Sequence, residues 1–375
     1  METEYRKDPV NVLSEDMVAY ASQRPIATGR KARIGFIGIG WWATSNHIPV
    51  LKLRNDVELV GACGLDEEMN ARVQRDFGFS MSTTDFDALL REDLDGVVVA
   101  SPHPWHGRHA IAALEAGCHV YVEKPFTTKV AEAREIVRLA EARERHVVVS
   151  HGWHYRPLII KAKELMAKGL VGEIQHVVCH MATPGGRGLF AGEIFEYPGS
   201  YLPVNTSTYA DPQATGGGYG QGQLSHALGL LFWLTQMEPK SVFSRMSNAG
   251  ASVDMYDAIT ATFQNGAIGV ISGAACLPAE ARYQVDLRIF GSEGTLNFDV
   301  DRERVDLFRH DGEHVFLEVA RDEGSYQCDG PLHNFIELIH GLEETNHSPA
   351  VIGMRAVEIL DAAYRSNASG KEEAV

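Results

Sequence analysis

A lysine between a glutamate and a proline, in the segment Glu123-Lys124-Pro125, is the first candidate for chemistry in this sequence. It directly follows the apolar run His119–Val122, which predicts a short strand. An ammonium at the carboxyl end of a strand can bond a substrate hydroxyl, and partial desolvation lowers its pKa toward the range of general acid–base catalysis. Pro125 permits a cis peptide bond that would aim the side chain. The alternative is a solvated surface lysine, because lysines are more often exposed.

The second candidate is His226, which lies in a predicted helix over residues 221–237. Its neighbours Gly222 and Gly229 are small, so we expect open space beside the imidazole that admits a cofactor or a substrate. No carboxylate on the same helix can orient the ring. The alternative is a purely structural histidine. Four residues beside the two candidates are expected to contact substrate: His154, Arg156, Tyr219 and Gln223.

The spacing G-x-G-x-x-A at Gly38, Gly40 and Ala43 follows an apolar run and predicts a strand, a tight turn and a helix. Gly38 allows the turn, Gly40 lets the backbone approach a pyrophosphate, and Ala43 lets the helix lie close to the strand. The helix start presents free N–H groups and the positive end of its dipole to phosphates. Trp41 and Trp42 are bulky for such a turn, and we expect their rings to wall the site or pack beneath the loop. We therefore predict a dinucleotide site here.

The choice of cofactor depends on the end of the predicted second strand, Val57–Cys63. An acidic residue usually holds the ribose hydroxyls at this place, but Gly64 follows the strand directly. Asp66 comes two residues later, where it either holds the ribose or caps the next helix. No arginine or lysine follows Gly64 to hold a 2′-phosphate. The sequence therefore favours NAD, with NADP as the alternative.

Apolar strand-like runs alternate with helix-like segments over residues 32–152, which implies an α/β Rossmann domain with a doubly wound parallel sheet. Gly96–Ala100, for example, is apolar throughout, as in a strand that is covered on both faces. Ligands of such sheets bind beyond the carboxyl ends of the strands. Polar clusters stand at four of these ends: Gly38–Ala43, Ser101–His106, Glu123–Pro125 and His151–Arg156. The predicted cofactor contacts are Gly38, Gly40, Trp41, Trp42, Asp66, Ser101, His103, His106, Glu123, Lys124 and Pro125.

Residues 153–375 predict a second, α+β domain for substrate binding and oligomerisation. Short alternating strands over residues 241–299, with a turn at Asn265-Gly266, indicate a large and mostly antiparallel open sheet. The run Val270–Cys276 is apolar on both alternations, which favours a homodimer or homotetramer that joins through this sheet. The C-terminal helices are expected to pack either within this second domain or back on the first domain.

The segment over residues 183–220 reads as a long loop, and loops of this length are usually functional. Rings interleaved with polar groups suit a sugar or glycoside pocket, and an interface or lid without substrate contact is the alternative. The aromatic residues of the segment include Phe190, Phe195, Tyr197, Tyr201 and Tyr209.

The 375 residues are enough for two domains, and residues 1–31 read as an N-terminal extension or arm. The net charge of −16 argues against nucleic acid or an anionic membrane as partner and favours a neutral small molecule. We find neither an 18-residue apolar run nor the apolar core of a signal peptide, so a cytoplasmic protein is expected. The five cysteines form no C-x-x-C motif, and we expect reduced, buried thiols.

Sixteen histidines raise the question of a metal site. The pairs His103/His106 and His151/His154 share the spacing H-x-x-H at neighbouring predicted strand ends. This spacing differs from H-E-x-x-H, and no carboxylate ligand is obvious. We therefore expect no metal.

Several segments together resemble the Gfo/Idh/MocA family, the group of glucose–fructose oxidoreductase and inositol dehydrogenase. The resemblance extends over residues 32–370 and rests on GFIGIGWWA, SPHPWH, HVYVEKPF, HGWHYRP, GGGYGQGQLSH, IFGSEGTL and AYRSNASG. It implies an N-terminal Rossmann domain, a C-terminal open antiparallel sheet, a nicotinamide cofactor and hydride transfer at a sugar or cyclitol carbon. It also implies that Lys124 and His226 are the active-site lysine and histidine.

The sequence departs from the family pattern G-G-G-x-x-x-D-x-G-x-H-x-x-D, because glycine stands at both aspartate positions, Gly222 and Gly229. His154 also stands where the family often has arginine, with Arg156 nearby. These differences indicate either another substrate or a loss of activity. Three functions stay open: an NAD(P)-dependent oxidoreductase acting on a secondary hydroxyl of a sugar, cyclitol or glycoside; an enzyme that cleaves glycosides through transient oxidation; and a non-catalytic nucleotide- or sugar-binding homologue.

Overall fold

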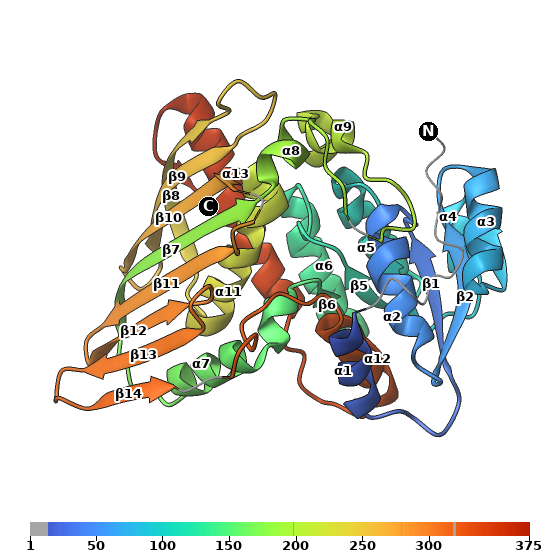
Figure 1. Cartoon of the computed structure of the whole chain (residues 1–375), viewed down its shortest axis with the longest axis horizontal. Helices are drawn as coiled ribbons and strands as arrows, with labels where there is room; N and C mark the ends of the chain where they lie inside the picture. The colour runs from blue at the N-terminus through green and yellow to red at the C-terminus, as the bar shows by residue number, and fades with distance from the viewer. Residues whose placement is uncertain (1–13, 198, 279, 318–319) are drawn as a thin grey trace. The chain divides into compact units, whose positions relative to one another are not determined.

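The computed structural model of the chain describes residues 14–197, 199–278, 280–317 and 320–375, and its contacts form two compact units. The chain up to Gly152 forms unit 1, and two later segments, Glu196–Asn205 and Gln327–Ala350, return to it (Figure 1). Unit 2 comprises Trp153–Phe195, Thr206–Tyr326 and Val351–Val375.

Unit 1 is built on a six-stranded parallel sheet with the order β3-β2-β1-β4-β5-β6, which confirms the predicted doubly wound Rossmann fold. The reversal of strand order lies between β1 and β4, where such sheets bind their ligands. Val97, Val98 and Val99 of β4 have no exposed surface, as expected of a strand that is covered on both faces. The strands are β1 (Ala32–Ile37), β2 (Val57–Cys63), β3 (Met81–Thr83), β4 (Gly96–Val99), β5 (His119–Val122) and β6 (Val147–Val149).

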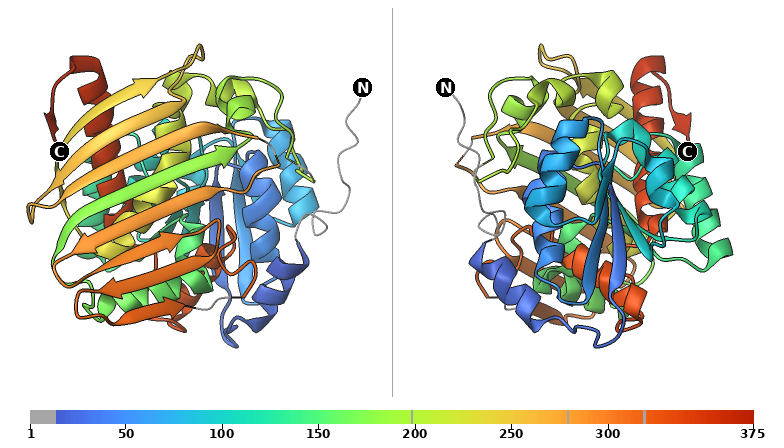
Figure 2. Two further views of the ribbon diagram at one scale, coloured as in Figure 1. Left: turned by 60° about the vertical axis from the view of Figure 1, so that its left-hand side comes forward. Right: turned by 90° about the vertical axis from the view of Figure 1, so that its right-hand side faces the viewer.

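Helices cover both faces of the unit 1 sheet (Figure 2, right). Helices α4, α5 and α6 pack along one face, while α2, α3 and α12 pack along the other. The helices and turns are α1 (Glu15–Gln23), the π-helical turn η2 (Ala43–His47), α2 (Ile48–Lys52), α3 (Glu67–Phe77), α4 (Phe86–Leu90), η3 (His103–Trp105), α5 (His106–Glu115), α6 (Val130–Arg143) and α12 (Gly330–His340).

The described part of the predicted N-terminal arm, residues 14–31, packs on the rest of unit 1. Ser14 caps α1, and Arg24 after this helix forms an ion pair with the buried Glu337 of α12. Arg54 pairs with the same Glu337 at 3.4 Å and with Asp56 at 2.8 Å. A buried charge network therefore secures α1 to α12. The rest of the predicted arm, residues 1–13, lies outside the described residues.

Unit 2 is built on a mixed sheet of nine strands among the described residues, in the order β14-β13-β12-β11-β7-β10-β9-β8-β15. Only the pair β7–β10 is parallel in this part of the chain, so the predicted, mostly antiparallel sheet is confirmed. The strands are β7 (Ile174–Pro184), β8 (Pro239–Ser247), β9 (Tyr256–Phe263), β10 (Ile268–Leu277), β11 (Gln284–Gly291), β12 (Gly294–Asp299), β13 (Arg304–Arg309), β14 (His314–Leu317) and β15 (Glu373–Ala374).

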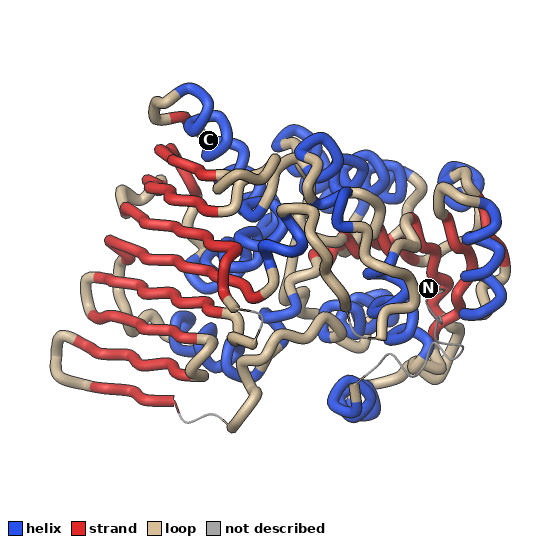
Figure 3. The backbone as a smooth tube through the Cα atoms, turned by 45° about the horizontal axis from the view of Figure 1, so that its top comes forward, coloured by secondary structure: helices blue, strands red, loops and turns tan. Residues whose placement is uncertain are grey.

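One face of the unit 2 sheet packs on helices, and among the described residues the other face carries none (Figure 2, left; Figure 3). The open face presents large apolar side chains, because alternate residues of each strand point outward. Cys276 lies at such an outward position and is exposed, so its predicted burial is wrong. The helices and turns are η4 (Gly152–Tyr155), α7 (Pro157–Ala167), α8 (Gly186–Phe190), α9 (Thr206–Tyr209), α10 (Pro212–Thr215), the π-helical turn η5 (Gly220–Leu224), α11 (Ser225–Thr235) and α13 (Ala350–Ser369).

The segment over residues 183–220, predicted as a loop, contains the short helices α8, α9 and α10. Helices of four or five residues are shorter than the span over which helical periodicity can be recognised, which explains the difference. Across the described parts of the chain, no helix combines the length and apolar composition needed to cross a membrane.

Candidate active site

The glycine turn of unit 1 lies at the carboxyl end of β1. Gly38 has φ of +97°, and a Cβ at this position would lie 2.2 Å from the backbone nitrogen of Ser101. Apart from its own chain neighbours, no described heavy atom lies within 4 Å of the Cβ position of Gly40. Gly38 therefore lets the turn pack on the loop after β4, whereas Gly40 leaves its backbone open to a ligand. This arrangement fits the pyrophosphate of a dinucleotide.

Glu123 is buried, and its carboxylate accepts hydrogen bonds from neighbouring elements. Its Oε1 accepts hydrogen bonds from Trp42 Nε1 at 2.9 Å and Ser150 Oγ at 2.7 Å, and lies 2.6 Å from His47 Nε2. Its Oε2 accepts from the backbone N–H of Lys124 at 3.0 Å. Burial by itself would raise the pKa of Glu123, but His47, Lys124 and Ser150 outweigh burial and lower it to about 2. The carboxylate thus ties the helix after the glycine turn to the ends of β5 and β6.

Lys124 follows Glu123 at the carboxyl end of β5, and its peptide bond to Pro125 is cis. The lysine side chain is half-buried. Burial lowers the pKa of the Lys124 ammonium, and the charge of Glu123 opposes this decrease. A lysine with a lowered pKa exchanges its proton more readily near neutral pH, as acid–base chemistry on a hydroxyl requires.

His106 connects the loops that follow β4 and β5. Its Nδ1 lies 2.8 Å from the carbonyl oxygen of Pro125, and its Nε2 lies 2.7 Å from that of Ser101. His103 packs against its ring, and Ser101 Oγ lies 2.9 Å from His109 Nδ1. Both nitrogens of this buried ring face backbone carbonyls, so His106 joins the two loops in the structure, and its contact with a cofactor stays a prediction.

Asp66 caps helix α3, because its Oδ1 accepts a hydrogen bond from the backbone N–H of Met69 at 2.7 Å. A Cβ at Gly64 would lie 2.4 Å from Asn70 Oδ1, so the position directly after β2 has no room for an acidic side chain. The capping role of Asp66 is therefore present in the structure, and a ribose contact by the same carboxylate stays a prediction.

The segment Glu196–Asn205 brings two aromatic rings onto unit 1. Tyr197 packs against Trp41 and Trp42, with ring centroids 5.3 and 5.9 Å apart. Tyr201 is buried, and its hydroxyl donates to Asp76 Oδ2 at 2.6 Å. Tyr201 is therefore a core residue of unit 1 and not part of a sugar pocket. The two tryptophan rings pack against a segment that is remote in sequence.

In unit 2, His226 near the start of α11 lies in an aromatic cluster. Its ring stands edge-on to Trp153 and Tyr326, with centroids 5.4 and 5.3 Å away. Trp153 also contacts Tyr326 at 4.9 Å and Tyr283 at 5.9 Å. His226 is 5% exposed and its ring packs against Trp153 and Tyr326, so the expected open space beside it is wrong. Trp153 stands in the motif HGWHYRP, but no local pattern marks Tyr283 or Tyr326, and sequence reasoning missed them.

The place of the absent aspartate at Gly222 is filled by another side chain. A Cβ at Gly222 would lie 2.7 Å from two ring atoms of Phe190, which is itself buried. An aspartate would therefore collide with this ring. The absence of a side chain at Gly222 thus makes room for the ring of Phe190.

Two of the predicted substrate contacts are core residues of unit 2. Tyr219 has no exposed surface, and its hydroxyl donates to the carbonyl oxygen of Met181 at 3.1 Å. His154 is equally buried and stacks on Trp233 at 5.0 Å with an interplanar angle of 11°. These environments place both side chains in the interior, where they support the fold.

The other two predicted substrate contacts retain accessible surface. Gln223 lies in the π-helical turn before α11 and is half-buried. Arg156 is also half-buried, and its Nη2 donates to the carbonyl oxygen of Asp322 at 2.8 Å. Of the four, Gln223 and Arg156 are therefore the ones that a ligand of unit 2 can reach.

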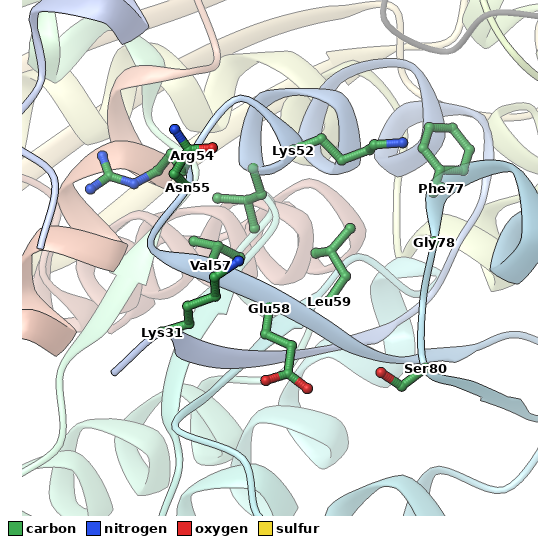
Figure 4. A pocket seen from close by; sticks show the side chains of 11 residues that line it. Lys31, Lys52, Arg54, Asn55, Val57, Glu58, Leu59, Phe77, Gly78 and Ser80 are labelled. Carbon is green, nitrogen blue, oxygen red and sulfur yellow. The ribbon is translucent and has the colours of Figure 1, made fainter. Parts of the chain in front are cut away.

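A surface hollow of unit 1 lies at the opposite edge of the parallel sheet, around the starts of β1 and β2 (Figure 4). Ligands of such sheets bind at the carboxyl ends of the strands, so we assign no catalytic role to this hollow. Nor do the residues that the structure describes include a group of three or more His, Cys, Asp or Glu that could hold a metal ion. The hollow is lined by Lys31, Leu51, Lys52, Arg54, Asn55, Val57, Glu58, Leu59, Phe77, Gly78 and Ser80.

Comparison with curated proteins finds relatives that match part of the chain. D-glucoside 3-dehydrogenase of Escherichia coli K12 is 33% identical over 150 residues, which are 39% of this chain and 42% of that protein. A 1-carboxy-3-chloro-3,4-dihydroxycyclohexa-1,5-diene dehydrogenase of Comamonas testosteroni is 27% identical over 238 residues, which are 62% of this chain and 55% of that protein. The chain thus spans about half the length of these relatives.

A solved structure with a similar fold is an oxidoreductase domain protein from Kribbella flavida, with a TM-score of 0.74 and 22% identity over 92% of this chain and 100% of that chain. Two family descriptions match the sequence. "Oxidoreductase family, NAD-binding Rossmann fold" covers residues 32–151, and "GFO/IDH/MocA C-terminal domain" covers residues 159–297. With both of its domains matched, the chain belongs to the Gfo/Idh/MocA family of oxidoreductases and carries an NAD-binding Rossmann domain.

Proposed function

We propose that this protein is an NAD-dependent oxidoreductase that transfers hydride between the nicotinamide and a secondary hydroxyl or ketone of a sugar, cyclitol or glycoside. In the oxidative direction, the C–H bond of the alcohol carbon breaks as hydride leaves, and the hydroxyl proton passes to a base. The carbon becomes a ketone. Bound NAD supplies the acceptor for the hydride, and the protein must bind, orient and exchange the proton.

The observation that carries the proposal is the environment of Lys124. Its ammonium stands at the carboxyl edge of the parallel sheet, directly after the carboxylate that holds the glycine turn together. Burial lowers its pKa, so it is suited to exchange a proton with a hydroxyl. NADP is disfavoured in this proposal, because the segment after β2 offers Asp66 and no cation for a 2′-phosphate.

In unit 2, His226 is proposed as the active-site histidine and Gln223 as a substrate contact. Tyr283 and Tyr326, which pack on Trp153, retain accessible surface, and their rings suit the apolar face of a sugar ring. Two curated relatives are named for D-glucoside and D-xylose, which supports a carbohydrate substrate.

The test incubates the purified protein with NAD or NADP and a panel of sugars, inositols and glycosides. Reduced nicotinamide is followed by its absorbance, and the products are analysed. Oxidation of a polyol with NAD supports the proposal. Cleavage of a glycoside without net reduction of NAD would indicate the transient-oxidation alternative, and NAD binding without any turnover would indicate a binding protein.

A double-substitution cycle tests whether Lys124 and His226 serve one step. Residues that act as a unit give non-additive losses. We expect K124A/H226A to lower kcat little more than K124A does. Fully multiplicative losses would show that the two residues act independently.

We also propose that the open face of the unit 2 sheet joins copies of this chain. Exposed apolar side chains recur on this face across its strands, and large exposed apolar patches mark association sites. Light scattering during size-exclusion chromatography should give a multiple of the 41.2 kDa chain mass, and V270D should shift the mass toward that of one chain. A monomeric wild-type protein would contradict this assembly. The face carries Phe243, Ile268, Val270, Phe290, Phe308 and Phe316.

A further inference from the structure

Asp254, between β8 and β9, holds the glycine-rich turn that precedes His226. Its Oδ1 accepts from the backbone N–H of Gly218 at 2.7 Å, and its Oδ2 accepts from that of Gly220 at 2.8 Å. Its carbonyl oxygen accepts from the N–H of Tyr219 at 2.9 Å. Three consecutive backbone amides of the turn are thus bound by one residue.

Close packing leaves the turn little freedom around this residue. A Cβ at Gly218 would lie 2.4 Å from the carbonyl oxygen of Asp254, and a Cβ at Gly217 would lie 2.3 Å from the hydroxyl oxygen of Tyr364. Tyr364 of α13 also donates its hydroxyl to Asp254 Oδ1 at 2.8 Å. The glycines therefore let the turn lie directly against Asp254 and Tyr364.

A second carboxyl group, Asp257, lies buried beside Asp254. Burial and the neighbouring charge of Asp254 raise the pKa of Asp257 well above its usual value. The carboxylate that the turn binds is that of Asp254, because the N–H groups of Gly218 and Gly220 both donate to it. This carboxylate binds the N-terminal end of the helical segment formed by η5 and α11, where a negative charge is favourable.

We propose that Asp254 is a positioning residue of the candidate active site, whose carboxylate fixes the start of the helical segment that carries Gln223 and His226. Asp254 touches neither a substrate nor a cofactor in this account; it sets where those two side chains lie. The inference rests on the proposed function, because positioning becomes visible as turnover only if His226 and Gln223 serve a reaction.

The test compares D254N with D306N in the full-length protein. Asp306 on β13 is a buried carboxylate of the same unit that pairs with Arg304, so D306N controls for the loss of a buried charge. An amide at position 254 cannot accept both N–H groups as a carboxylate does. D254N should lower kcat about 10²-fold, the scale of a misplacement of about 1 Å, with Kd for NAD within about twofold of wild type. D306N should leave kcat unchanged, and an unchanged kcat in folded D254N would overturn the proposal.

Hydrogen exchange provides a readout that is independent of activity. The amides of Gly218 and Gly220 should exchange at least about tenfold faster in D254N than in wild type, because each loses a bond to a charged acceptor. The ring signals of His226 in NMR spectra should shift in D254N and stay in place in D306N. If wild type turns over no polyol, the proposed function fails, and these two measurements still decide the role of Asp254.

Y364F keeps the inference testable if D254N does not fold. It removes one donor to Asp254 and leaves the carboxylate in place. Exchange at Gly218 and Gly220 should quicken severalfold, with a smaller decrease of kcat than for D254N. Wild-type exchange together with unchanged His226 signals in Y364F would contradict the proposal.

Discussion

The two units hold their candidate active-site residues in similar ways. In each, a glycine-rich turn leads into a π-helical turn and then an α-helix, and a carboxylate from elsewhere in the same unit binds the segment. π-Helical turns are frequent at functional sites. The carboxylate is Glu123 in unit 1 and Asp254 in unit 2.

The difference lies in what each carboxylate binds. Glu123 is buried, binds side chains of the helix, and precedes Lys124 directly, so one short motif contains both the anchor and the reactive group. Asp254 binds backbone amides and precedes no reactive group. The first arrangement can be recognised locally in the sequence, whereas the second exists only after folding.

Removing the reactive group of unit 1 should have the largest effect. K124A should lower kcat by about 10²–10⁴-fold, the usual contribution of a general acid or base, because the proton-exchanging ammonium is lost. NAD binding should persist, since Glu123 and the glycine turn remain. Steady-state kinetics and NAD titration measure both. K129A, which removes an exposed lysine paired with Glu132, is the matched control, and equal kcat values for the two variants would disprove the assignment.

Adding a methyl group to each glycine turn separates packing from ligand access. G38A should destabilise unit 1 by about 3 kcal/mol, because its Cβ would meet Ser101 and its φ is positive. G40A should fold normally and bind NAD more weakly. G218A should disturb unit 2 instead, since its Cβ would meet Asp254.

Thermal unfolding and NAD titration distinguish these three variants. A G38A protein as stable as G40A would show that the turn does not pack on the loop after β4 as described. G218A should bind NAD with normal affinity, because its turn belongs to unit 2 and the nucleotide turn to unit 1.

The pH dependence of stability tests the anchor of unit 1. The pKa of Glu123 is lowered from 4.5 to about 2 in the folded protein, so its stabilisation is complete above pH 4.5 and is lost as the pH falls toward 2. E123Q lacks this contribution, so its stability deficit relative to wild type should shrink by about 3 kcal/mol over that range. Denaturant unfolding at several pH values measures this change.

The exposed Glu135 pairs with Arg138 and provides the control. E135Q should retain a pH dependence close to that of wild type. Parallel curves for E123Q and wild type would show that the Glu123 carboxylate is not stabilised by its neighbours.

The smallest effect is expected at Asp66. D66N should cost at most about 1 kcal/mol of stability, because asparagine also caps helices, and should weaken NAD binding if the carboxylate holds the ribose. Asp85 caps α4 in the same way, with its side chain accepting from Asp87 N–H at 2.9 Å, and D85N is the matched control. Equal NAD affinities of the two variants would leave Asp66 as a cap only.

Much of the fold could be predicted because its signals are local. The alternation of apolar runs and helices specified the parallel sheet, and the turn at Asn265-Gly266 indicated the hairpin of β9 and β10. Strands β13 and β14 were missed, because RVDLFR and HVFL are short and carry only a brief alternation. The N-terminal charge network around Arg54 and Glu337 was also missed, because its members are about 280 residues apart.

In the candidate site, too, the local contacts could be predicted and the contacts between remote residues could not. Glu123 and Lys124 stand in one motif, so their proximity follows from the sequence. The aromatic cluster of His226 draws on residues from 153 to 326, and Tyr201 binds unit 1 from the middle of the chain. Such contacts depend on tertiary packing, which no periodicity encodes.

The central claim is hydride transfer that requires Lys124, and isotope transfer tests it most directly. The protein is incubated with NAD and C-deuterated polyols or glycosides that were active in the panel, and the nicotinamide is analysed by mass spectrometry. We predict one deuterium in the reduced cofactor with wild type and with K129A, and a rate of incorporation about 10²–10⁴-fold lower with K124A. Reduced cofactor without deuterium, or wild-type incorporation by K124A, would contradict the account.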